Sequence, residues 1–411
     1  MRKVIATVLF VLVLLFVFLS CAGGPSADEL AAQEEARQAA EKARRDSLEI
    51  EVQKSLSFGM EYYKNGQYAD AIPHFKRIIY ELNPDEERAW KYLADSYFRM
   101  NMPDSAFGVY RNGIAKFPEN AYLHRGLGIL FQQNTMLDSA MAEYMKAFEF
   151  DPKDAFSATQ IGRLYLSLAK LDTALLWFET SVKADSNNVE IWEKLADLYM
   201  VRGNWEGVKE AYQNLHRINP ENADYILNLG RATANTGDYE TAITTLNKYI
   251  KNNPEDFKGY QYMALIYVAD SKFNDALESF KKAEELAPEN VKLLLDIADT
   301  YVEMKRFDSA ARYLNKARNV EPNSCQAIVT EGNICTGRAR AAVPTEGIGI
   351  REKLSFQCCY DIYKRALRSD CERWADVARV KMDYLKQYLP TDQERKEFFF
   401  IHPELEGKIC D

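Results

Sequence analysis

Small and aromatic residues recur along most of the chain with one fixed period. Alanine, or valine once, occupies eight positions: Ala71, Ala106, Ala140, Ala174, Val208, Ala242, Ala276 and Ala310. The interval between neighbouring positions is constant from Ala106 onward, and the first interval is longer by a single residue. An aromatic residue or leucine follows each of these positions four residues later, from Phe75 to Leu314. Residues four apart share one face of a helix, so each period predicts a helix with a small and a large side chain on its packing face.

A second recurring pattern predicts another helix in every period. A large apolar residue followed by glycine or alanine stands at Phe58-Gly59, Leu93-Ala94, Leu127-Gly128, Ile161-Gly162, Leu195-Ala196, Leu229-Gly230, Met263-Ala264 and Ile297-Ala298. Turn residues such as Asn65-Gly66 and Arg202-Gly203 end this helix, and proline closes most periods between Pro84 and Pro322. Each period is therefore predicted to be a helical hairpin whose small residues face each other.

This arrangement resembles the tetratricopeptide repeat (TPR) family over residues 51–322, where it accounts for eight hairpins. The resemblance implies an all-α fold: a right-handed TPR superhelical solenoid of about eight to nine hairpins with a C-terminal capping helical segment. One departure from the family pattern is an extra residue between Ala71 and Pro84. Because each repeat packs only on its neighbours, such an array can exceed the usual size of one globular core.

Residues 323–411 depart from the regular pattern. Ile328 and Gly332 keep the phase of a ninth repeat, which we expect to be degenerate and to carry an insertion at about residues 337–351. Cysteine-rich capping helices are expected to follow. Thr391 and Glu394 have the spacing of a capping box and predict the start of a last short helix.

Residues 1–20 have the order of a lipoprotein-type signal peptide. Arg2 and Lys3 precede an uninterrupted apolar run from Val4 to Leu19, and Ser20 and Cys21 follow. The end of the run resembles the bacterial lipobox, although Phe18 stands where that family usually has leucine. The resemblance implies a TPR lipoprotein of the diderm bacterial cell envelope, acylated at Cys21 with fatty acids such as palmitate. An uncleaved transmembrane anchor and simple secretion remain alternatives, and the run is slightly shorter than the roughly 20 residues of a membrane span.

Residues 21–50 are expected to form the lipid-anchored cysteine and a spacer. Gly23-Gly24-Pro25 is flexible, and the following segment is rich in helix-forming residues but has few large apolar ones before Leu48. A solvated helical stalk and a coiled-coil partner helix are both compatible with this composition. The resemblance places the mature protein at the outer membrane, most simply on its periplasmic face.

Charge and motifs argue against two functional classes. The formal net charge is −9, and no cluster of Lys and Arg with interleaved aromatics stands out, which argues against nucleic acid as a partner. The four histidines belong to no HExxH or Cys/His pattern, and GxSxG, GxGxxG and P-loop motifs are missing from the sequence. We therefore expect no enzyme activity, no cofactor and no metal.

Six of the seven cysteines lie near the C-terminus: Cys325, Cys335, Cys358, Cys359, Cys371 and Cys410. Without a CxxC pair, a zinc ribbon has no support. An even number at one end of an exported chain favours disulfides that fasten the degenerate repeat, with 15 possible connectivities. Buried free thiols, and a metal or redox function, remain as alternatives.

In the TPR family, partners bind the concave face, which is lined by the first helix of each hairpin. The corresponding positions here are Arg88, Lys91, Asp95, Arg99, Tyr122, Arg125, Arg163, Asn228, Arg231, Tyr262, Asp296 and Asp299. The carboxylate clamp of chaperone-binding members is not supported, because Asp95 replaces an expected asparagine and Tyr122 and Gly126 replace the basic pair. Arg88, Arg99, Arg125 and Arg163 could instead form a basic strip for an acidic peptide or a C-terminal carboxylate, or be ordinary surface charge.

These features predict a non-enzymatic protein–protein interaction scaffold or adaptor of the bacterial cell envelope. Its partner would be a protein or peptide held in the concave groove, and its membrane contact would be the N-terminal lipid. The alternative from another class is an envelope enzyme or thiol-redox accessory that uses the C-terminal cysteines. Glycan binding through Tyr122 and Tyr262 is a third possibility. The sequence identifies neither the partner nor the oligomeric state.

Overall fold

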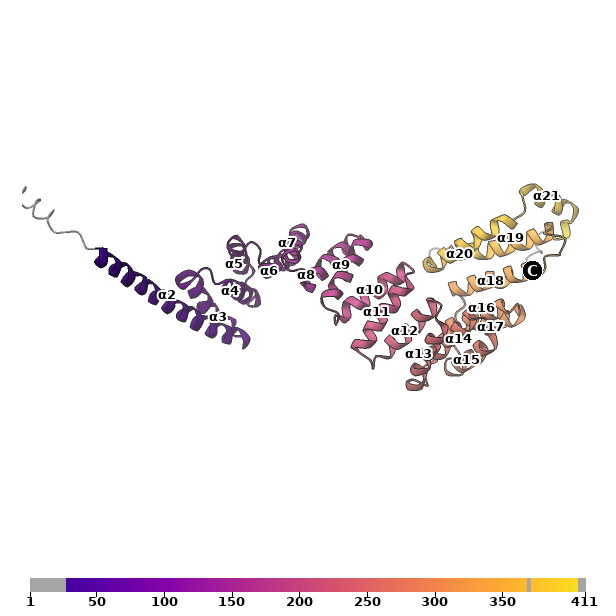
Figure 1. Ribbon diagram of the computed structural model, residues 1–411. Coiled ribbons are helices and arrows are strands. Elements are labelled where there is room, and N and C mark those ends of the chain that lie inside the picture. The colour runs from indigo at the N-terminus through magenta and orange to yellow at the C-terminus, as the bar shows by residue number, and fades with distance from the viewer. Residues whose placement is uncertain (1–26, 368–370, 406–411) are drawn as a thin grey trace, which may run out of the picture. The chain divides into compact units, whose positions relative to one another are not determined.

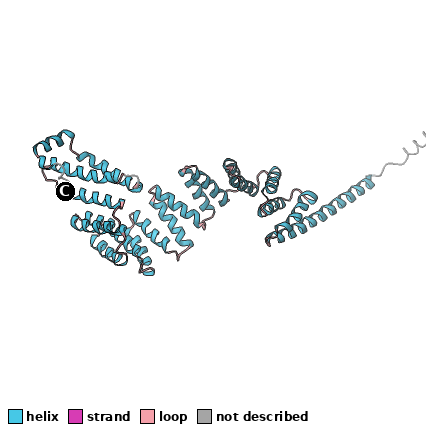
Figure 2. Cartoon of the chain, turned by 180° about the vertical axis from the view of Figure 1, so that it is seen from behind, coloured by secondary structure: helices cyan, strands magenta, loops and turns pink. Residues whose placement is uncertain are grey.

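The computed structural model describes residues 27–367 and 371–405, and in this part of the chain every regular element is a helix (Figure 1, Figure 2). The chain divides between Asp185 and Ser186 into two compact units. Each unit is a series of helical hairpins in which consecutive helices pack on one another. The predicted all-α fold of TPR hairpins is therefore confirmed. Cys21 and Cys410, by contrast, lie outside the described residues.

The first unit contains four hairpins. They are α2 (Ala27–Lys64) with α3 (Tyr68–Arg77), α4 (Glu87–Arg99) with α5 (Pro103–Lys116), α6 (Ala121–Gln133) with α7 (Leu137–Phe150), and α8 (Ala155–Ser167) with α9 (Leu171–Ala184). The helical part of the expected spacer and the first helix of the first hairpin are one continuous helix, α2. The described side chains of α2 are exposed as far as Ser47, and the first buried one is Val52.

The second unit continues the same pattern. Its hairpins are α10 (Val189–Val201) with α11 (Trp205–Ile218), α12 (Ala223–Asn235) with α13 (Tyr239–Asn252), α14 (Phe257–Ala269) with α15 (Phe273–Leu286), α16 (Val291–Glu303) with α17 (Phe307–Val320), and α18 (Cys325–Ala341) with α19 (Ile350–Arg365). Two further helices follow, α20 (Glu372–Leu385) and α21 (Asp392–Ile401), with short 3₁₀ turns at Lys386–Tyr388 and Pro403–Leu405. The ninth hairpin predicted from the sequence is α18 with α19.

The alanine positions form the centre of every regular hairpin. The seven alanines at the repeated position are fully buried, and Val208, which takes their place once, is buried with them. Glycines on the facing helix are as tightly packed: a Cβ on Gly128 or Gly162 would overlap the ring of Tyr144 or Phe178. The small residues therefore let the two helices approach until an aromatic ring fills the remaining space.

The extra residue of the first repeat is absorbed by a local change of helix type. Residues Ile78–Leu82, which continue α3, form a π-helical turn, and the amide of Asn83 donates to the carbonyl of Ile78 five residues earlier at 2.7 Å. A π turn accommodates one more residue than an α turn. The repeat thus keeps its packing although the interval from Ala71 to Ala106 is longer than the others.

The first helices of the eight regular repeats end in a recurring turn, and those from α6 to α16 also begin at a recurring capping residue. Asn or Asp side chains cap the helix starts by accepting a backbone N–H bond, at Asn120, Asp154, Asn188, Asn222, Asp256 and Asn290. The turn after the helix has a positive φ at Gly66, Asn101, Thr135, Ala169, Gly203, Gly237, Ser271 and Lys305. Glycine adopts this left-handed conformation without steric cost, whereas the other residues do so with some strain.

At one position of the repeat, a ring nitrogen forms a hydrogen bond to the loop that precedes its helix. This bond occurs in three repeats. The indole nitrogens of Trp90 and Trp192 donate to the carbonyls of Pro84 and Ser186 at 2.9 and 3.0 Å. His124 occupies the position of Trp90 in the next repeat, and its Nε2 lies 2.8 Å from the carbonyl of Pro118. This histidine is therefore a buried structural substitute for tryptophan.

The C-terminal helices are linked by disulfides. Cys335 of α18 pairs with Cys359 of α19, and Cys325 pairs with Cys371 at the start of α20, with Cα–Cα distances of 5.4 and 5.6 Å. Cys358 is disulfide-bonded as well. Figure 1 shows α18, α19 and α20 alongside one another in the second unit. The predicted capping box of α21 is present, with Thr391 and Glu394 each bonding the other's backbone N–H.

The α18 helix continues five residues into the segment that was expected to be an insertion. Its last residue is Ala341, so the insertion anticipated from about residue 337 reduces to the connection between Ala342 and Gly349. Among the residues that the structure describes, no helix is both long and apolar enough to cross a membrane.

Candidate functional site: hollows along the first helices

A single position of the repeat recurs in the lining of three surface hollows. Counted from Asp95 through the successive repeats, this position is occupied by Asp95, Ile129, Arg163, Asp197, Arg231, Leu265 and Asp299. Asp95 and Ile129 line a hollow in the first unit, which we call the first hollow. Arg231 and Leu265 line the second hollow, and Asp299 lines the third. The helix face selected from the sequence is therefore the face on which these hollows open.

The first hollow has a volume of about 340 Å³ and lies among α4, α5, α6 and α8. Its apolar lining consists of Phe98, Tyr110, Tyr122, Ile129 and Phe156 with Gly126, and its charged residues are Asp95, Arg99 and Arg125. Gly126 matters because a Cβ at this position would overlap the ring of Tyr110. The structure thus brings together four residues predicted from the sequence: Asp95, Arg99, Tyr122 and Arg125.

Both arginines of the first hollow are held by carboxylates. Arg125 donates from Nη1 to Asp154 Oδ1 at 3.0 Å, and its guanidinium lies 4.9 Å from the centre of the Tyr122 ring. Arg99 donates from Nε to Asp95 at 3.3 Å. The hydroxyl of Tyr63 donates to the same Asp95 carboxylate. Each guanidinium has five N–H donors, so donors remain for a ligand.

Burial raises the tyrosine pKa values around this hollow. Desolvation, with a further contribution from the Asp95 charge, raises the pKa of Tyr122 to about 12. Burial also raises the pKa of Tyr63, and its hydrogen bond to Asp95 acts in the same direction. These phenols are therefore neutral at physiological pH and act as hydrogen-bonding and stacking groups.

The second hollow has a volume of about 260 Å³ and lies among α11, α12 and α14. The guanidinium of Arg231 lies 5.8 Å from the ring centre of Trp205 and 5.8 Å from that of Tyr262. A cation between two aromatic faces is positioned by both of them. The predicted pair Arg231 and Tyr262 is thus brought together, with Trp205 as an additional residue.

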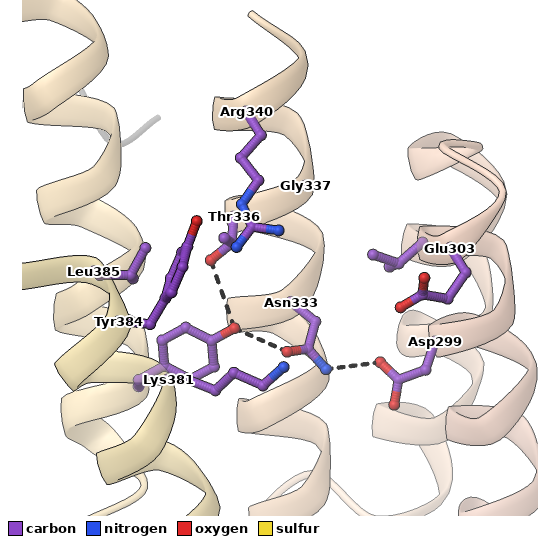
Figure 3. Close-up of a pocket in the computed structure, with 11 residues that line it drawn as sticks. Asp299, Glu303, Asn333, Thr336, Gly337, Arg340, Lys381, Tyr384 and Leu385 are labelled. Atoms are coloured by element: carbon purple, nitrogen blue, oxygen red, sulfur yellow. Dashed lines mark hydrogen bonds between the residues drawn. The ribbon is translucent and has the colours of Figure 1, made fainter. Parts of the chain in front are cut away.

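The third hollow is smaller and more polar, with a volume of about 130 Å³ among α16, α18, α19 and α20 (Figure 3). The amide of Asn333 donates to Asp299 at 3.0 Å, and its oxygen accepts from the hydroxyl of Tyr363 at 2.8 Å. Burial raises the pKa of Asp299 to about 6, which the hydrogen bonds from Asn333 and Thr330 only partly offset. Asp296, one turn earlier, accepts from Gln261 at 2.6 Å and Lys292 at 3.0 Å.

The remaining predicted positions lie outside the linings of these three hollows. Arg88 bonds Glu86 in the N-terminal turn of α4, and Lys91 pairs with Glu87 at 2.6 Å. Asn228 donates to the carbonyl of Asp224 within its own helix. Arg163 is an exposed residue of α8. Because Arg88, Arg99 and Arg125 each have a carboxylate partner, the suggested basic strip is largely neutralised.

Several lining residues were missed by the sequence analysis. Phe156 and Trp205 are examples, as are Arg340 and Lys381 of the third hollow. Phe156 could have been found, because it occupies the position of Tyr122 in the following repeat. Arg340 and Lys381 lie beyond the regular repeats, where no period identifies equivalent positions.

The cysteines do not form a further site in the described chain. Cys359 is fully buried, and its disulfide to Cys335 joins two packed helices. No group of three or more His, Cys, Asp or Glu residues among the described residues has the arrangement of a metal site. The disulfide alternative is the one that the structure displays.

Two protein-family models match the chain. Residues 56–111 match the tetratricopeptide repeat, and residues 154–343 match the C-terminal domain of cilia and flagella-associated protein 70. No curated protein is similar enough to count as a match.

Solved structures with similar helical repeats include three examples. YrrB, described as a TPR protein with an unusual peptide-binding site, is 20% identical with a TM-score of 0.34, covering 46% of this chain and 97% of YrrB. MamA is 25% identical with a TM-score of 0.34, covering 39% and 95% of the two chains. A tetratricopeptide repeat protein from Parabacteroides merdae is 17% identical with a TM-score of 0.35, covering 61% and 98%.

These TM-scores are too low to support an assignment by themselves. The assignment rests on the constant repeat interval, the buried alanines and the match of residues 56–111. The chain is thus built from helical hairpins of the tetratricopeptide repeat kind, and the match to the family model itself covers residues 56–111.

Proposed function

We propose that this chain is a non-enzymatic interaction scaffold of the bacterial cell envelope that binds a peptide segment of a partner protein in the first hollow. Tetratricopeptide repeat proteins are protein-interaction scaffolds, which supports the general class. The observation that carries the proposal is the first hollow itself, where two arginines flank an aromatic and apolar lining.

The chemistry of the first hollow favours one kind of peptide. Two arginines face two carboxylates, Asp95 and Asp154, so the local charge is balanced and a strongly acidic peptide gains little. A single carboxylate can still receive the unused N–H donors of Arg125, whose side chain is 31% exposed. The neighbouring rings suit one apolar side chain. We therefore expect a peptide with an apolar C-terminal residue and a free C-terminal carboxylate.

The experiment measures binding of fluorescent peptides to the mature full-length chain. Peptides that end in an apolar residue are compared as free acids and as C-terminal amides. The free acids are expected to bind at least about tenfold more tightly, because the amide loses a charge-assisted bond to guanidinium. Equal binding of acid and amide would contradict the proposal.

Matched variants locate the binding site. Arg125→Gln and Tyr122→Ala are expected to weaken binding of the free acid. Arg88→Gln is the control, because it removes the same charge one repeat earlier at a residue that does not line the first hollow. If Arg88→Gln were as damaging as Arg125→Gln, general surface charge would explain the binding instead.

The envelope location and the lipid anchor are a second part of the proposal. They rest on the N-terminal sequence and on Cys21, which lies outside the described residues. The disulfides of the second unit support an oxidising compartment, where such bonds form and persist. An intact-mass measurement tests this part: cleavage before Cys21 with added acyl chains is expected, and a mass without either change would contradict it.

A thiol-redox function is not favoured by the geometry. Cys358 and Cys359 are both disulfide-bonded, and Cys359 has no exposed surface. Ser substitution at these two positions is compared with Ala substitution at Arg125 and Arg163 in a cellular assay of the protein. Loss of function in the cysteine variants alone, with the fold intact, would overturn the scaffold proposal.

A further inference from the structure

The third hollow lies where the last regular repeat meets the disulfide-linked C-terminal helices. Its walls come from α16, α18, α19 and α20, so it exists only when these four helices are packed together. Its volume of about 130 Å³ is well below the roughly 300–1,000 Å³ of sites for drug-sized ligands. Any occupant must therefore be small, and its chemistry must match the charges of the walls.

One wall of the third hollow is acidic. Asp299 and Glu303 lie one turn apart on α16, and Figure 3 shows both carboxylates on the side of the hollow opposite α20. Two linked hydrogen bonds hold Asp299 in place. The hydroxyl of Tyr363 donates to the Asn333 side-chain oxygen, and the Asn333 amide nitrogen donates to Asp299. Among the described residues no Lys, Arg or His forms an ion pair with Asp299. A half-buried carboxylate without a bonded cation is a costly arrangement that an ammonium group would relieve.

The opposite part of the third hollow is basic. Arg340 of α18 and Lys381 of α20 line it, and Figure 3 shows the Lys381 amine directed toward Asn333. The Arg340 guanidinium lies 4.7 Å from the ring centre of Tyr384 and has no carboxylate partner within the described part of the chain. Lys381 likewise has no described ion-pair partner. Neither of these two cations is held by a carboxylate in the described part of the chain, whereas both arginines of the first hollow are.

Two carboxylates and two unpaired cations balance in charge but occupy different walls. We propose that the third hollow binds a small zwitterion of the α-amino acid class, with its ammonium toward Asp299 and Glu303 and its carboxylate toward Arg340 and Lys381. Neither a simple anion nor a simple cation satisfies both walls, whereas a zwitterion pairs with each of them. Desolvation is the main cause of the raised pKa of Asp299; the charge of Asp296 raises this pKa further, and the charge of Lys381 lowers it.

The test is calorimetric titration of the disulfide-intact, mature full chain with glycine and L-alanine. The comparison compounds are N-acetylglycine, which lacks the ammonium, and glycinamide, which lacks the carboxylate, all at one ionic strength. The zwitterions are expected to bind saturably and at least about tenfold more tightly than either comparison compound. No binding, or equal binding of all four, would overturn the proposal.

A further arm separates a free amino acid from a peptide end. Triglycine carries the same two charged groups but places them two residues further apart, and we expect it to bind at least about tenfold more weakly than glycine. Tighter binding of triglycine than of glycine would overturn the amino-acid proposal in favour of peptide recognition.

Variants assign the binding to the third hollow. Asp299→Asn and Lys381→Met are each expected to weaken glycine binding at least about tenfold. Lys381 is exposed, so its replacement leaves the packing intact and keeps the test valid if Asp299→Asn folds poorly. Lys386→Met is the control, because Lys386 pairs with Asp383 outside the third hollow and its replacement should not change glycine binding. Unchanged binding by Lys381→Met would refute the assignment.

Discussion

Arg125 of α6 donates a hydrogen bond to Asp154, which is also the residue that caps the start of α8. Asp154 accepts from the backbone amide of Ser157 at 3.2 Å and from its hydroxyl at 2.6 Å, and its side chain is 2% exposed. One buried carboxylate therefore serves two hairpins. It begins the helix of one and orients the candidate binding arginine of the other.

Replacing Asp154 should separate these two roles. Asp154→Ala removes both the cap and the arginine partner, and is expected to destabilise the first unit by about 2–4 kcal/mol. Asp154→Asn keeps an oxygen that can cap α8 but loses the charge, so its cost should be smaller. Hydrogen exchange of α8 amides measures both effects. Asp151→Ala, which removes only an exposed bond to the Lys153 amide, is the control and should have little effect.

Gly126 should tolerate no side chain. Its added Cβ would overlap the Tyr110 ring, which lines the first hollow, so Gly126→Ala is expected to cost about 1–3 kcal/mol and to weaken peptide binding. Gly108→Ala in α5 is the matched control. Nothing lies within 4 Å of its added Cβ, and it should stabilise the helix by about 0.5–1 kcal/mol. Urea unfolding compares the two, and equal stabilities would contradict the close packing.

Exchanging glycine and alanine at two equivalent turns should change stability in opposite directions. Gly203 has a φ of 67° with no atom within 4 Å of an added Cβ, so Gly203→Ala should cost about 1 kcal/mol through backbone strain alone. Ala169 occupies the equivalent turn at a φ of 55°. Ala169→Gly relieves that strain and should stabilise α8 and α9. The gain should be smaller than the cost of Gly203→Ala, because glycine also gives the unfolded chain more conformational entropy. Hydrogen exchange of the flanking helices measures both variants.

The pH dependence of stability should reveal Asp299. Its pKa is about 6 in the folded chain and roughly 3.9 when unfolded, so the folded state binds the proton more tightly. The free energy of unfolding therefore increases as the pH falls through 6 and Asp299 takes up its proton. Above pH 6 the ionised carboxylate lowers the free energy of unfolding. Between pH 7.5 and pH 5 the gain is about 1 kcal/mol.

The variant Asp299→Asn supplies the comparison for this pH effect. The stability difference between the wild type and Asp299→Asn, measured by hydrogen exchange of α16, should move in favour of the wild type by that amount as pH falls to 5. A difference that stays constant over this range would show that Asp299 does not titrate there.

The disulfides should stabilise the second unit alone. They close sequence separations of 46 and 24 residues, for which chain entropy predicts about 3–4 kcal/mol each. Reduction of the full chain should speed hydrogen exchange in α18, α19 and α20. The helices α4 to α9 serve as an internal control, because that stretch contains no cysteine. Thiol titration of the denatured, unreduced chain checks the bonds directly, and six reactive thiols would exclude them.

The sequence by itself determined the repeated hairpins, because their causes are local and periodic. The alanines, the residues four positions later and the turn glycines act within one helix or one hairpin, so their spacing predicts the structure. The same phase placed Asp95, Arg231 and Asp299 on the helix face that carries the hollows. Even the π turn at Ile78–Leu82 corresponds to a countable extra residue, although the sequence did not show how the helix would absorb it.

Only the tertiary structure decided which of those residues act together. The pairing of Arg125 with Asp154 joins residues of two different hairpins, and no local rule distinguishes Arg125 from Arg88, which bonds Glu86 instead. The disulfide connectivity and the placement of Arg340 and Lys381 in one hollow likewise depend on how α18, α19 and α20 pack. The helices α18, α19 and α20 lie beyond the last regular repeat. Their side-chain arrangement follows from three-dimensional packing, because the repeat period no longer applies there.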